Sequence, residues 1–340
     1  MATTITTVAG TGAQGYDGDG GPADQSLMDN PFHVELDRSQ RHLFIADCFN
    51  YCVRMVDLQT NVIATIAGTG QTGYSGDGGP ATDARIEEIY AVQVAENGDV
   101  YILQRFSPAI RKVDASTGII TTVAGDGTVG DGGDGGPATN AQMREPNDCA
   151  LDGMGGLLIA DIQDQRVRRL DIDTGIITTF AGTGGKVHSG DGGPASEAGI
   201  FGARAVCVDG RGNTYICERE GNSVRKVDSD GIITLVAGTG EKGYAGDGGS
   251  ASKATFNGPK AIRCDADGNV LVVDTENHSI RKIDVSDGTI STVAGGRQGP
   301  EGDGGDSTLA GLARPHGIVA DAHGAFYIAD SQNHRVRRVS

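Results

Sequence analysis

The sequence predicts an all-β protein, a six-bladed β-propeller whose blades each contain four strands. Three observations lead to this fold class. One unit of about 57 residues recurs six times, each unit contains four short β-branched runs, and the two ends of the chain complement each other. We therefore expect one domain over residues 1–340, a ring of blades closed by an N-terminal strand that joins the C-terminal blade.

An Ala-Gly pair marks the start of each repeat. It is followed every time by a glycine-rich segment that contains Gly-Asp-Gly-Gly, and then by the apolar runs. Similarity of a chain to itself at a fixed period is the sequence signature of repeat architectures. The repeats begin near residues 9, 67, 124, 181, 237 and 294, and the recurring acids are Asp19, Asp77, Asp134, Asp191, Asp247 and Asp303.

Four short apolar runs follow within each unit. In the fourth unit the first three runs are residues 206–209, 214–216 and 224–228, and a Gly-Ile-Ile-Thr segment begins the last. These runs are rich in β-branched residues and are bounded by Gly, Asn or Asp, which is typical of strands. Four strands per unit at a fixed period predict the blades of a propeller.

The two ends of the chain support a closed ring. The last unit stops at residues 337–340, after its third strand, whereas residues 3–8 match the fourth strand of a unit. We expect residues 3–8 to complete the last blade. This arrangement leaves no open sheet edge that could pair with a neighbouring molecule.

Composition excludes several classes of protein. The net charge of −17 argues against a protein that coats nucleic acid or binds an anionic membrane, and no stretch approaches the roughly 18 apolar residues of a membrane span. The six cysteines match neither a disulfide scaffold nor a tight metal site, so we expect free thiols in a reducing compartment. Residues 1–8 do not resemble a signal peptide. This predicts a cytoplasmic location for the chain as written, and an extracytoplasmic one if a longer protein supplies a leader.

The motif Ile-Ala-Asp-x-x-Asn-His-Arg-Val-Arg-Arg-Val at residues 328–339 resembles the NHL repeat. The Ala-Gly-Thr-Gly and Gly-Asp-Gly-Gly-Pro-Ala segments resemble its glycine-rich variant, and the resemblance covers the whole chain. It implies a six-bladed propeller but does not choose a function. NHL propellers include protein- and RNA-binding modules and an amidating lyase that binds zinc through axial histidines. The wider six-bladed class includes lactonases, phosphotriesterases and strictosidine-synthase-like enzymes.

Positions that are the same in all units are expected to serve the blade. An arginine recurs in every third strand and an aspartate ends five of the six first strands, so we predict hydrogen bonds within or between blades. The Asn-His pairs at 277–278 and 333–334 are likewise expected to be hydrogen-bonded loop residues, whereas His188 has no obvious partner. The arginines are Arg54, Arg111, Arg168, Arg225, Arg281 and Arg337, and the aspartates are Asp37, Asp152, Asp209, Asp265 and Asp321.

The Gly-Asp-Gly-Gly segments also invite interpretation as calcium or phosphate loops. Only one acid recurs per unit, however, and no strand and long helix frame the glycines as a phosphate loop requires. Pro22 and its equivalents suit the start of a short helix. We therefore expect a turn and a helix of one or two turns that walls the mouth of the propeller.

Positions that vary between units are candidates for a site. The first strand of each blade lies nearest the axis, and Val34 and its equivalents are uniformly apolar, which assigns the alternate positions to the axis. Ionisable groups in such a confined channel must be paired or used. The polar residues at these axial positions are His33, Glu35, Gln93, Asp148 and Arg263. One position earlier, at the start of the strand, are Phe32, Tyr90, Asn147, Arg204, Lys260 and His316.

The loop between the second and third strands opens at the same end of each blade as the long connections. The recurring acid of this loop, Asp47 in the first blade, becomes Gln104 in the second and Glu218 in the fourth. A concave mouth that mixes aromatic rings, cations and acids suits a polar or anionic small molecule. The predicted substrate-binding residues are Phe32, Tyr90, Gln93, Arg105, Phe106, Asn147, Arg204, Glu218, Arg219, Lys260 and His316.

We favour an enzyme that acts on a small molecule by acid–base chemistry of the lyase, hydrolase or isomerase type. The base or acid in the axial funnel would be His33, Glu35 or Asp148, and developing negative charge would be stabilised by Arg263, Arg204 or Lys260. A metal version would use His33 and His316 with Asp148 or Glu35. The amidating lyase uses three axial histidines, so two histidines disfavour zinc and leave open a divalent cation on the axis held by carboxylates.

Two other interpretations stay open. Glu35 and Arg263 could pair across the narrow ring and plug it, or the chain could be a non-catalytic NHL-type module that binds a protein or ligand at the mouth. An open funnel of charged residues would favour the enzyme, and a filled axis with a broad apolar rim would favour a protein partner. The expected partner is a small-molecule ligand, with neither nucleic acid nor membrane.

Overall fold

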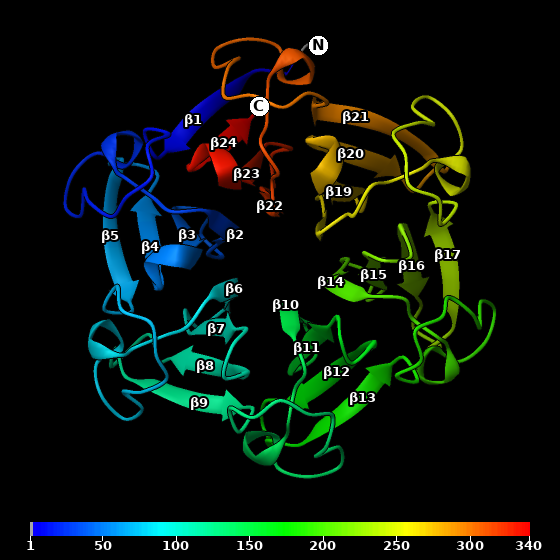
Figure 1. The fold of residues 1–340 in the computed structure, drawn as a ribbon, viewed down its shortest axis with the longest axis horizontal. Helices are drawn as coiled ribbons and strands as arrows, with labels where there is room; N and C mark the ends of the chain where they lie inside the picture. The colour runs from blue at the N-terminus through cyan, green and yellow to red at the C-terminus, as the bar shows by residue number, and fades with distance from the viewer. Residues whose placement is uncertain (1–2) are drawn as a thin grey trace.

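The computed structural model describes residues 3–340. Six four-stranded antiparallel sheets surround a central axis, and strand β1 (Ile5–Ala9) lies in the same sheet as the last three strands of the chain (Figure 1). Ile5 stands opposite Val339, so residues near the two ends of the chain pair directly. The predicted six-bladed all-β propeller and its closure by the N-terminal strand are confirmed. No helix in residues 3–340 is long and apolar enough to cross a membrane.

The strands of each blade follow one another from the axis outward. Blade 1 contains β2 (Pro31–Leu36), β3 (His42–Asp47), β4 (Cys52–Asp57) and β5 (Val62–Ala67). Blade 2 contains β6 (Ile89–Val94), β7 (Val100–Gln104), β8 (Ala109–Val113) and β9 (Ile120–Ala124). Blade 3 contains β10 (Pro146–Leu151), β11 (Gly156–Asp161), β12 (Arg166–Asp171) and β13 (Ile177–Ala181).

The second half of the ring repeats this pattern. Blade 4 contains β14 (Ala203–Val208), β15 (Thr214–Glu218), β16 (Ser223–Val227) and β17 (Ile233–Ala237). Blade 5 contains β18 (Ala261–Cys264), β19 (Val270–Asp274), β20 (Ser279–Asp284) and β21 (Thr289–Gly295). Blade 6 contains β22 (Gly317–Ala320), β23 (Phe326–Asp330) and β24 (Arg335–Val339), with β1 as its outer strand.

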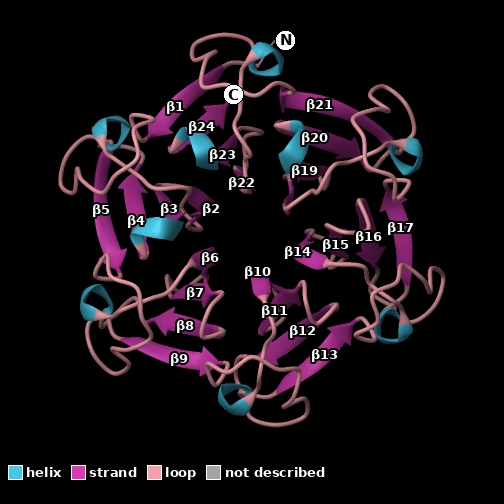
Figure 2. Ribbon diagram, in the orientation of Figure 1, coloured by secondary structure: helices cyan, strands magenta, loops and turns pink. Residues whose placement is uncertain are grey.

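A short helix forms in each long connection as expected, but the expectation that it walls the mouth was wrong. Each long connection forms only a single 3₁₀ turn, and these turns lie at the outer edge of the ring (Figure 2). Pro22 precedes the first of them and bridges to Val62 in the outer strand, so backbone pairing with that strand draws the connection outward. The perimeter turns are η1 (Ala23–Gln25), η3 (Ala81–Asp83), η4 (Ala138–Asn140), η5 (Ala195–Glu197), η6 (Ala251–Lys253) and η8 (Ser307–Leu309). Three more follow second strands: η2 (Cys48–Asn50), η7 (Thr275–Asn277) and η9 (Ser331–Asn333).

The recurring arginine and the recurring acid of the glycine-rich segment bind each other. Arg54 Nη2 lies 2.7 Å from Asp19 Oδ1, and the arginine side chain is completely buried. The equivalent pair forms in all six blades, which explains why both residues repeat and confirms their structural interpretation. The loop histidines are also hydrogen-bonded as predicted, because His278 Nδ1 accepts from the backbone N–H of Arg314 and His334 Nδ1 from that of Asn30.

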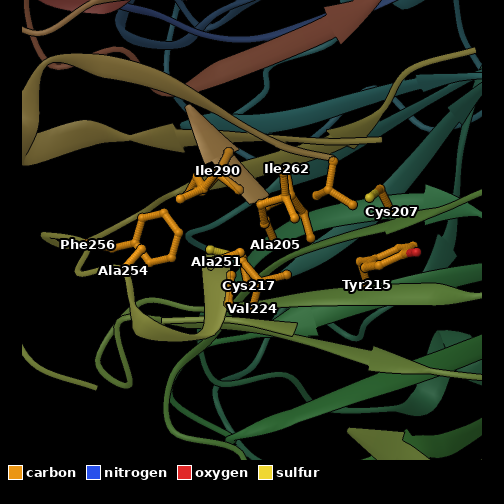
Figure 3. Packing of buried hydrophobic residues seen from close by; sticks show 14 residues of the cluster. Ala205, Cys207, Tyr215, Cys217, Val224, Ala251, Ala254, Phe256, Ile262 and Ile290 are labelled. Carbon is orange, nitrogen blue, oxygen red and sulfur yellow. The ribbon is translucent and has the colours of Figure 1, made fainter. Parts of the chain in front are cut away.

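The hydrophobic core lies between neighbouring blades. One cluster joins Ala205 and Val224 of blade 4 to Ile262 of blade 5, and Phe256 from the connection completes it (Figure 3). The uniformly apolar position of the first strand contributes here, as its alternation predicted. All six cysteines are free thiols, and Cys207 is one of those buried in this cluster.

The Ala-Gly pair has a local steric cause. Gly68 follows the outer strand of blade 1 with a φ of +92°, and a Cβ atom there would lie 2.3 Å from the carbonyl oxygen of Tyr51. Only glycine tolerates both the left-handed backbone and this close approach. The connection can therefore turn away from the strand at this residue.

Candidate functional site

Phe32 and its equivalents reach the mouth because a β-bulge opens the first strand of four blades. We use "mouth" for the end of the axis where the loops between second and third strands open. In β2, Pro31 pairs with Asp47 and His33 with Ala46, which leaves Phe32 without a partner. A bulge re-aims the side chain of the extra residue, and bulges are common beside functional sites. The equivalent residues are Tyr90, Asn147 and Arg204 in β6, β10 and β14, and Lys260 and His316 just before β18 and β22.

A cavity of about 160 Å³ lies at the mouth. Its lining contains four basic side chains and one carboxylate, although the chain as a whole carries a charge of −17. The Phe32 ring stacks on the His316 ring at 4.1 Å and meets the Tyr90 ring edge-on at 5.0 Å, which orders the wall. Seven predicted residues are brought together here. The lining residues are Tyr90, Arg105, Glu145, Asn147, Ile162, Arg204, Arg219, Lys260 and His316.

Two guanidinium groups of the cavity already have acidic partners. Arg105 Nη2 lies 2.6 Å from Glu145 Oε1, and its Nη1 lies 3.4 Å from Glu88 Oε2. Arg219 Nη1 lies 3.1 Å from Glu220 Oε1. The charge of each arginine is therefore at least partly compensated within the protein.

Arg204 differs from them because it has no such partner. It is 6% exposed, and no carboxylate among residues 3–340 lies within 4.0 Å of its guanidinium nitrogens. Its Nη1 donates a long hydrogen bond of 3.4 Å to the carbonyl oxygen of Asn147, and its guanidinium carbon lies 5.3 Å from the centre of the Tyr90 ring. Burial lowers the pKa of Arg204, which is the sign of a poorly compensated buried cation.

Lys260 and His316, from neighbouring blades, meet in the wall of the cavity. Lys260 Nζ lies 2.9 Å from His316 Nε2 and 3.6 Å from Glu276 Oε1. Burial, together with the charges of Arg204 and Arg314, lowers the pKa of Lys260 to about 7. Burial and the Lys260 and Arg204 charges also lower the pKa of His316 well below its usual value, so its imidazole is neutral.

His33, Glu35, Asp148 and Arg263 lie together on the axis, as the alternation along the first strands predicts. They come from blades 1, 3 and 5, which are not neighbours, so they can meet only at the centre of the ring. Arg263 Nη1 lies 3.3 Å from Asp148 Oδ2, its Nε lies 3.8 Å from Glu35 Oε2, and its Nη2 contacts His33 Nε2. Gln93 joins this axial network by donating a hydrogen bond of 2.7 Å to Glu35.

The axial network pairs its own charges. Burial opposes ionisation of Asp148, but Arg263 and His33 outweigh burial and lower the pKa of Asp148 to about 2. Glu35 and Arg263 pair across the ring, which is the arrangement of the plug interpretation. In the described part of the chain, the cavity lining includes no member of the network. A catalytic role for His33, Glu35, Asp148 and Arg263 stays a prediction.

These contacts also bear on the metal candidates. His33 Nε2 and Asp148 Oδ1 lie 3.3 Å apart, but the Arg263 guanidinium contacts both residues and opposes a cation beside them. His316 is hydrogen-bonded to Lys260 instead. Residues 3–340 contain no group of three or more His, Cys, Asp and Glu side chains that could hold a metal ion. The residues present therefore do not fit a divalent cation on the axis.

Besides Gln93 in the axial network, two more of the predicted binding residues lie away from the cavity. Glu218 is fully buried and accepts hydrogen bonds from Ser223 Oγ and from the backbone N–H of Phe201, in the structural place that Asp47 takes in blade 1. His188 contacts the same carboxylate through Nδ1, so the expectation that His188 has no partner was wrong. Phe106 is 50% exposed on the rim, where its ring lies under the Arg105 guanidinium.

Comparison of the six repeats with one another missed five residues of the site, although they occupy positions that vary between the repeats. Two residues before each mouth residue is a second variable position, and Glu88, Glu145 and Arg314 occupy it in blades 2, 3 and 6. Ile162 and Glu276 stand one and two residues after the recurring loop acid, at the positions that Arg105 and Phe106 take in blade 2.

Two family models match the chain. The teneurin NHL domain matches residues 237–299, and the NHL repeat matches residues 312–339. The same strand order and the same arginine–aspartate pair recur in all six blades of the structure. These findings support an NHL-repeat β-propeller.

Curated relatives of this NHL-repeat propeller are larger proteins. The chain is 24% identical over 323 residues to the protein SUPPRESSOR OF QUENCHING 1, chloroplastic, of Arabidopsis thaliana, covering 91% of this chain and 30% of that protein. It is 23% identical over 340 residues to NHL repeat-containing protein 2 of Gallus gallus, covering 90% of this chain and 46% of that protein. The chain therefore spans less than half the length of these relatives.

Solved structures with different named activities share the fold. An auxiliary nutrient binding protein from Bacteroides thetaiotaomicron superposes with a TM-score of 0.70 at 19% identity, over 99% of this chain and 76% of that one. A streptogramin B lyase superposes with a TM-score of 0.58 at 12% identity, over 100% of this chain and 98% of that one. At these identities the likeness shows the fold alone.

Proposed function

We propose that the mouth cavity of this NHL-repeat propeller binds a small anionic molecule and that the protein acts on it as an enzyme. Arg204 carries the proposal, because it is a buried guanidinium that lines a cavity and has no acidic partner within the described chain. A buried charge is costly unless it is paired or used. A carboxylate or phosphate group supplied by a ligand would pair with the guanidinium in a bidentate manner.

The size of the cavity limits the ligand. A volume of about 160 Å³ is well below the roughly 300–1,000 Å³ of pockets that hold drug-sized ligands. The ligand that fits is therefore a compact anion with few non-hydrogen atoms. The Tyr90 ring beside Arg204 provides an apolar surface for a short carbon chain.

The case for catalysis rests on Lys260 and His316. A lysine and a neutral imidazole 2.9 Å apart, both with lowered pKa values, line the same cavity as Arg204. Perturbed ionisable groups in a cavity are typical of acid–base chemistry near neutral pH. The fold is compatible with this function, since a streptogramin B lyase shares it, and equally with the binding function of the Bacteroides protein.

Calorimetric titration with acetate, pyruvate and phosphate tests the proposal. We expect at least one of these anions to bind the wild-type protein, and Arg204→Met to weaken binding by about tenfold to a hundredfold, as loss of a hydrogen bond to a charged group does. The exposed Arg211 is the control, and Arg211→Met should bind like the wild type. Equal binding by Arg204→Met would reject the proposal. Binding of an anion that the protein never converts would favour the non-catalytic binding module.

A further inference from the structure

Lys260 is a buried amine in the mouth cavity, where Arg204 already provides a cation for anion binding. Its side chain lines the mouth cavity and is 9% exposed. The charged groups around it are Arg204 of β14, Arg219 of the loop after β15, Glu276 of η7 and Arg314 before β22. Three of these four are cations, and Glu276 is already engaged by Arg314 at 2.6 Å. Lys260 is therefore held among positive charges, which favour its neutral form.

His316 presents a hydrogen-bond acceptor to this amine. Its Nδ1 lies 2.8 Å from the carbonyl oxygen of Arg314, and a carbonyl oxygen can only accept, so Nδ1 carries the hydrogen. Nε2 then has a free lone pair, and Lys260 Nζ donates to it at 2.9 Å. Stacking on Phe32 at an angle of 2° fixes the plane of the ring. The geometry is that of a base positioned to take a proton from a lysine ammonium group.

We propose that Lys260 forms an imine with the carbonyl carbon of a small oxo acid whose carboxylate binds Arg204. This step rests on the proposed function, because Arg204 must first hold the anion beside the amine. His316 Nε2 relays a proton from the ammonium group to the carbonyl oxygen as the neutral amine attacks the carbonyl carbon and a carbinolamine forms. His316 then relays a second proton from the amine to the hydroxyl group, which leaves as water and gives the protonated imine. The step consumes one amine and one carbonyl, releases one water and involves no oxidation or reduction.

The alternative role for Lys260, as a simple anion anchor, suits its surroundings less well. At pH 7 an amine with a pKa of about 7 is about half unprotonated, whereas an ordinary lysine amine with a pKa of about 10.4 is unprotonated at only about 0.04%. A half-neutral amine is a poor anchor beside arginines that stay charged, but it is a competent nucleophile. The cavity thus separates binding, at Arg204, from reaction, at Lys260.

Reductive trapping tests the proposal on the intact protein. Wild-type protein is incubated with pyruvate and sodium cyanoborohydride at pH 7, and the modified lysines are identified by peptide mass spectrometry. We expect the reduced pyruvate adduct on Lys260, formed on the order of a hundredfold faster than on Lys226 and Lys282, which lie in third strands and serve as internal controls. The rate at Lys260 should rise with pH through a midpoint near 7.

Two variants and the binding measurement separate this proposal from the proposed function. Lys260→Arg keeps a cation but cannot form an imine, so it should lose the adduct. His316→Gln should slow trapping at Lys260, whereas the surface control Arg211→Met should bind and trap pyruvate like the wild type. An adduct that is absent from Lys260 of the wild type, or no faster there than on Lys226, overturns the imine while measured pyruvate binding leaves the proposed function intact. If no small anion binds and no adduct forms, both proposals fail together.

Discussion

Arg263 is the centre of the axial network, and its replacement by methionine distinguishes a plug from a catalytic group. Methionine is unbranched and roughly as long, so it fills much of the space without the charge. Asp148 is 2% exposed and would lose its guanidinium partner, and Glu35 would lose its only cation within the network. The variant therefore leaves Asp148 buried with His33 as its remaining axial partner and without a guanidinium group.

The size of the effect follows from the contacts. The pKa of Asp148 falls from 3.8 to about 2 in the folded protein, which corresponds to about 2 kcal/mol of favourable interaction with its charged form. Arg263 also donates hydrogen bonds to the carbonyl oxygens of Ile262 and Val206, which the variant leaves unmade. Removing one partner of a buried pair costs about 3–5 kcal/mol. We expect Arg263→Met to lower the free energy of unfolding by that amount at pH 7.

The dependence on pH follows from the direction of the shift. Because the folded pKa of Asp148 lies below its unfolded value, its stabilisation is present above about pH 4 and is lost as the pH falls toward about 2. In Arg263→Met the largest influence that lowers the pKa of Asp148 is gone, so this pKa rises, and acid then protonates the carboxylate and removes the penalty. The difference in stability between variant and wild type should shrink as the pH falls below about 5.

Urea unfolding followed by circular dichroism measures these differences, with Arg211→Met as the surface control. The double variant Arg263→Met/Asp148→Asn should recover part of the loss, because it removes both partners of the pair. If Arg263→Met unfolds within about 1 kcal/mol of the wild type and yet loses an activity toward a small anion, the plug interpretation is refuted and the catalytic one is favoured.

Two further predictions concern single blades. Glu218 raises the pKa of His188 by accepting its hydrogen bond, so this contact stabilises the fold fully below the ordinary pKa of about 6.5 and loses that effect as the pH rises through the raised value. A melting-temperature profile between about pH 5 and 9 should be steeper for the wild type than for His188→Gln, and parallel profiles would argue against the contact. Arg54→Met should release the first glycine-rich connection, because Asp19 Oδ1 loses both hydrogen bonds that the guanidinium donates to it. Hydrogen exchange should then be faster in residues 17–27, and unchanged protection there would contradict the role assigned to the pair.

The fold could be predicted from the sequence because the same short strands recur in every unit. Each strand is short and locally encoded, and six copies average out the ambiguity of any single run. The chain ends were informative for the same reason, since residues 3–8 fit only one missing strand. The course of the long connections was harder to predict. Pro22 pairs with Val62 of the outer strand, and this pairing depends on where the backbone of the connection meets the ring.

The site was readable only in part. Alternation along the first strand placed the axial residues correctly, but it does not say which rotamers they adopt or whom they contact. Arg263 turns to Asp148 and His33, so charged groups from blades 1, 3 and 5 pair across the ring. Glu218 turns outward to Ser223 instead of into the mouth. Such choices are set by side chains far apart in sequence, and no local pattern records them.

The axial network and the mouth cavity both include residues of the first strands and their ends, and they differ in charge balance. In the axial network a single guanidinium faces Asp148 and Glu35 and is satisfied, so nothing there calls for a ligand. At the mouth, Arg204 has no acidic partner among the described residues. Since charges act over about 8 Å at physiological ionic strength, a small anion inside the cavity experiences this local excess, while a long polyanion also meets the field of a chain with net charge −17. We therefore expect the mouth to select small anions and to reject nucleic acids, although both carry the charge that Arg204 needs.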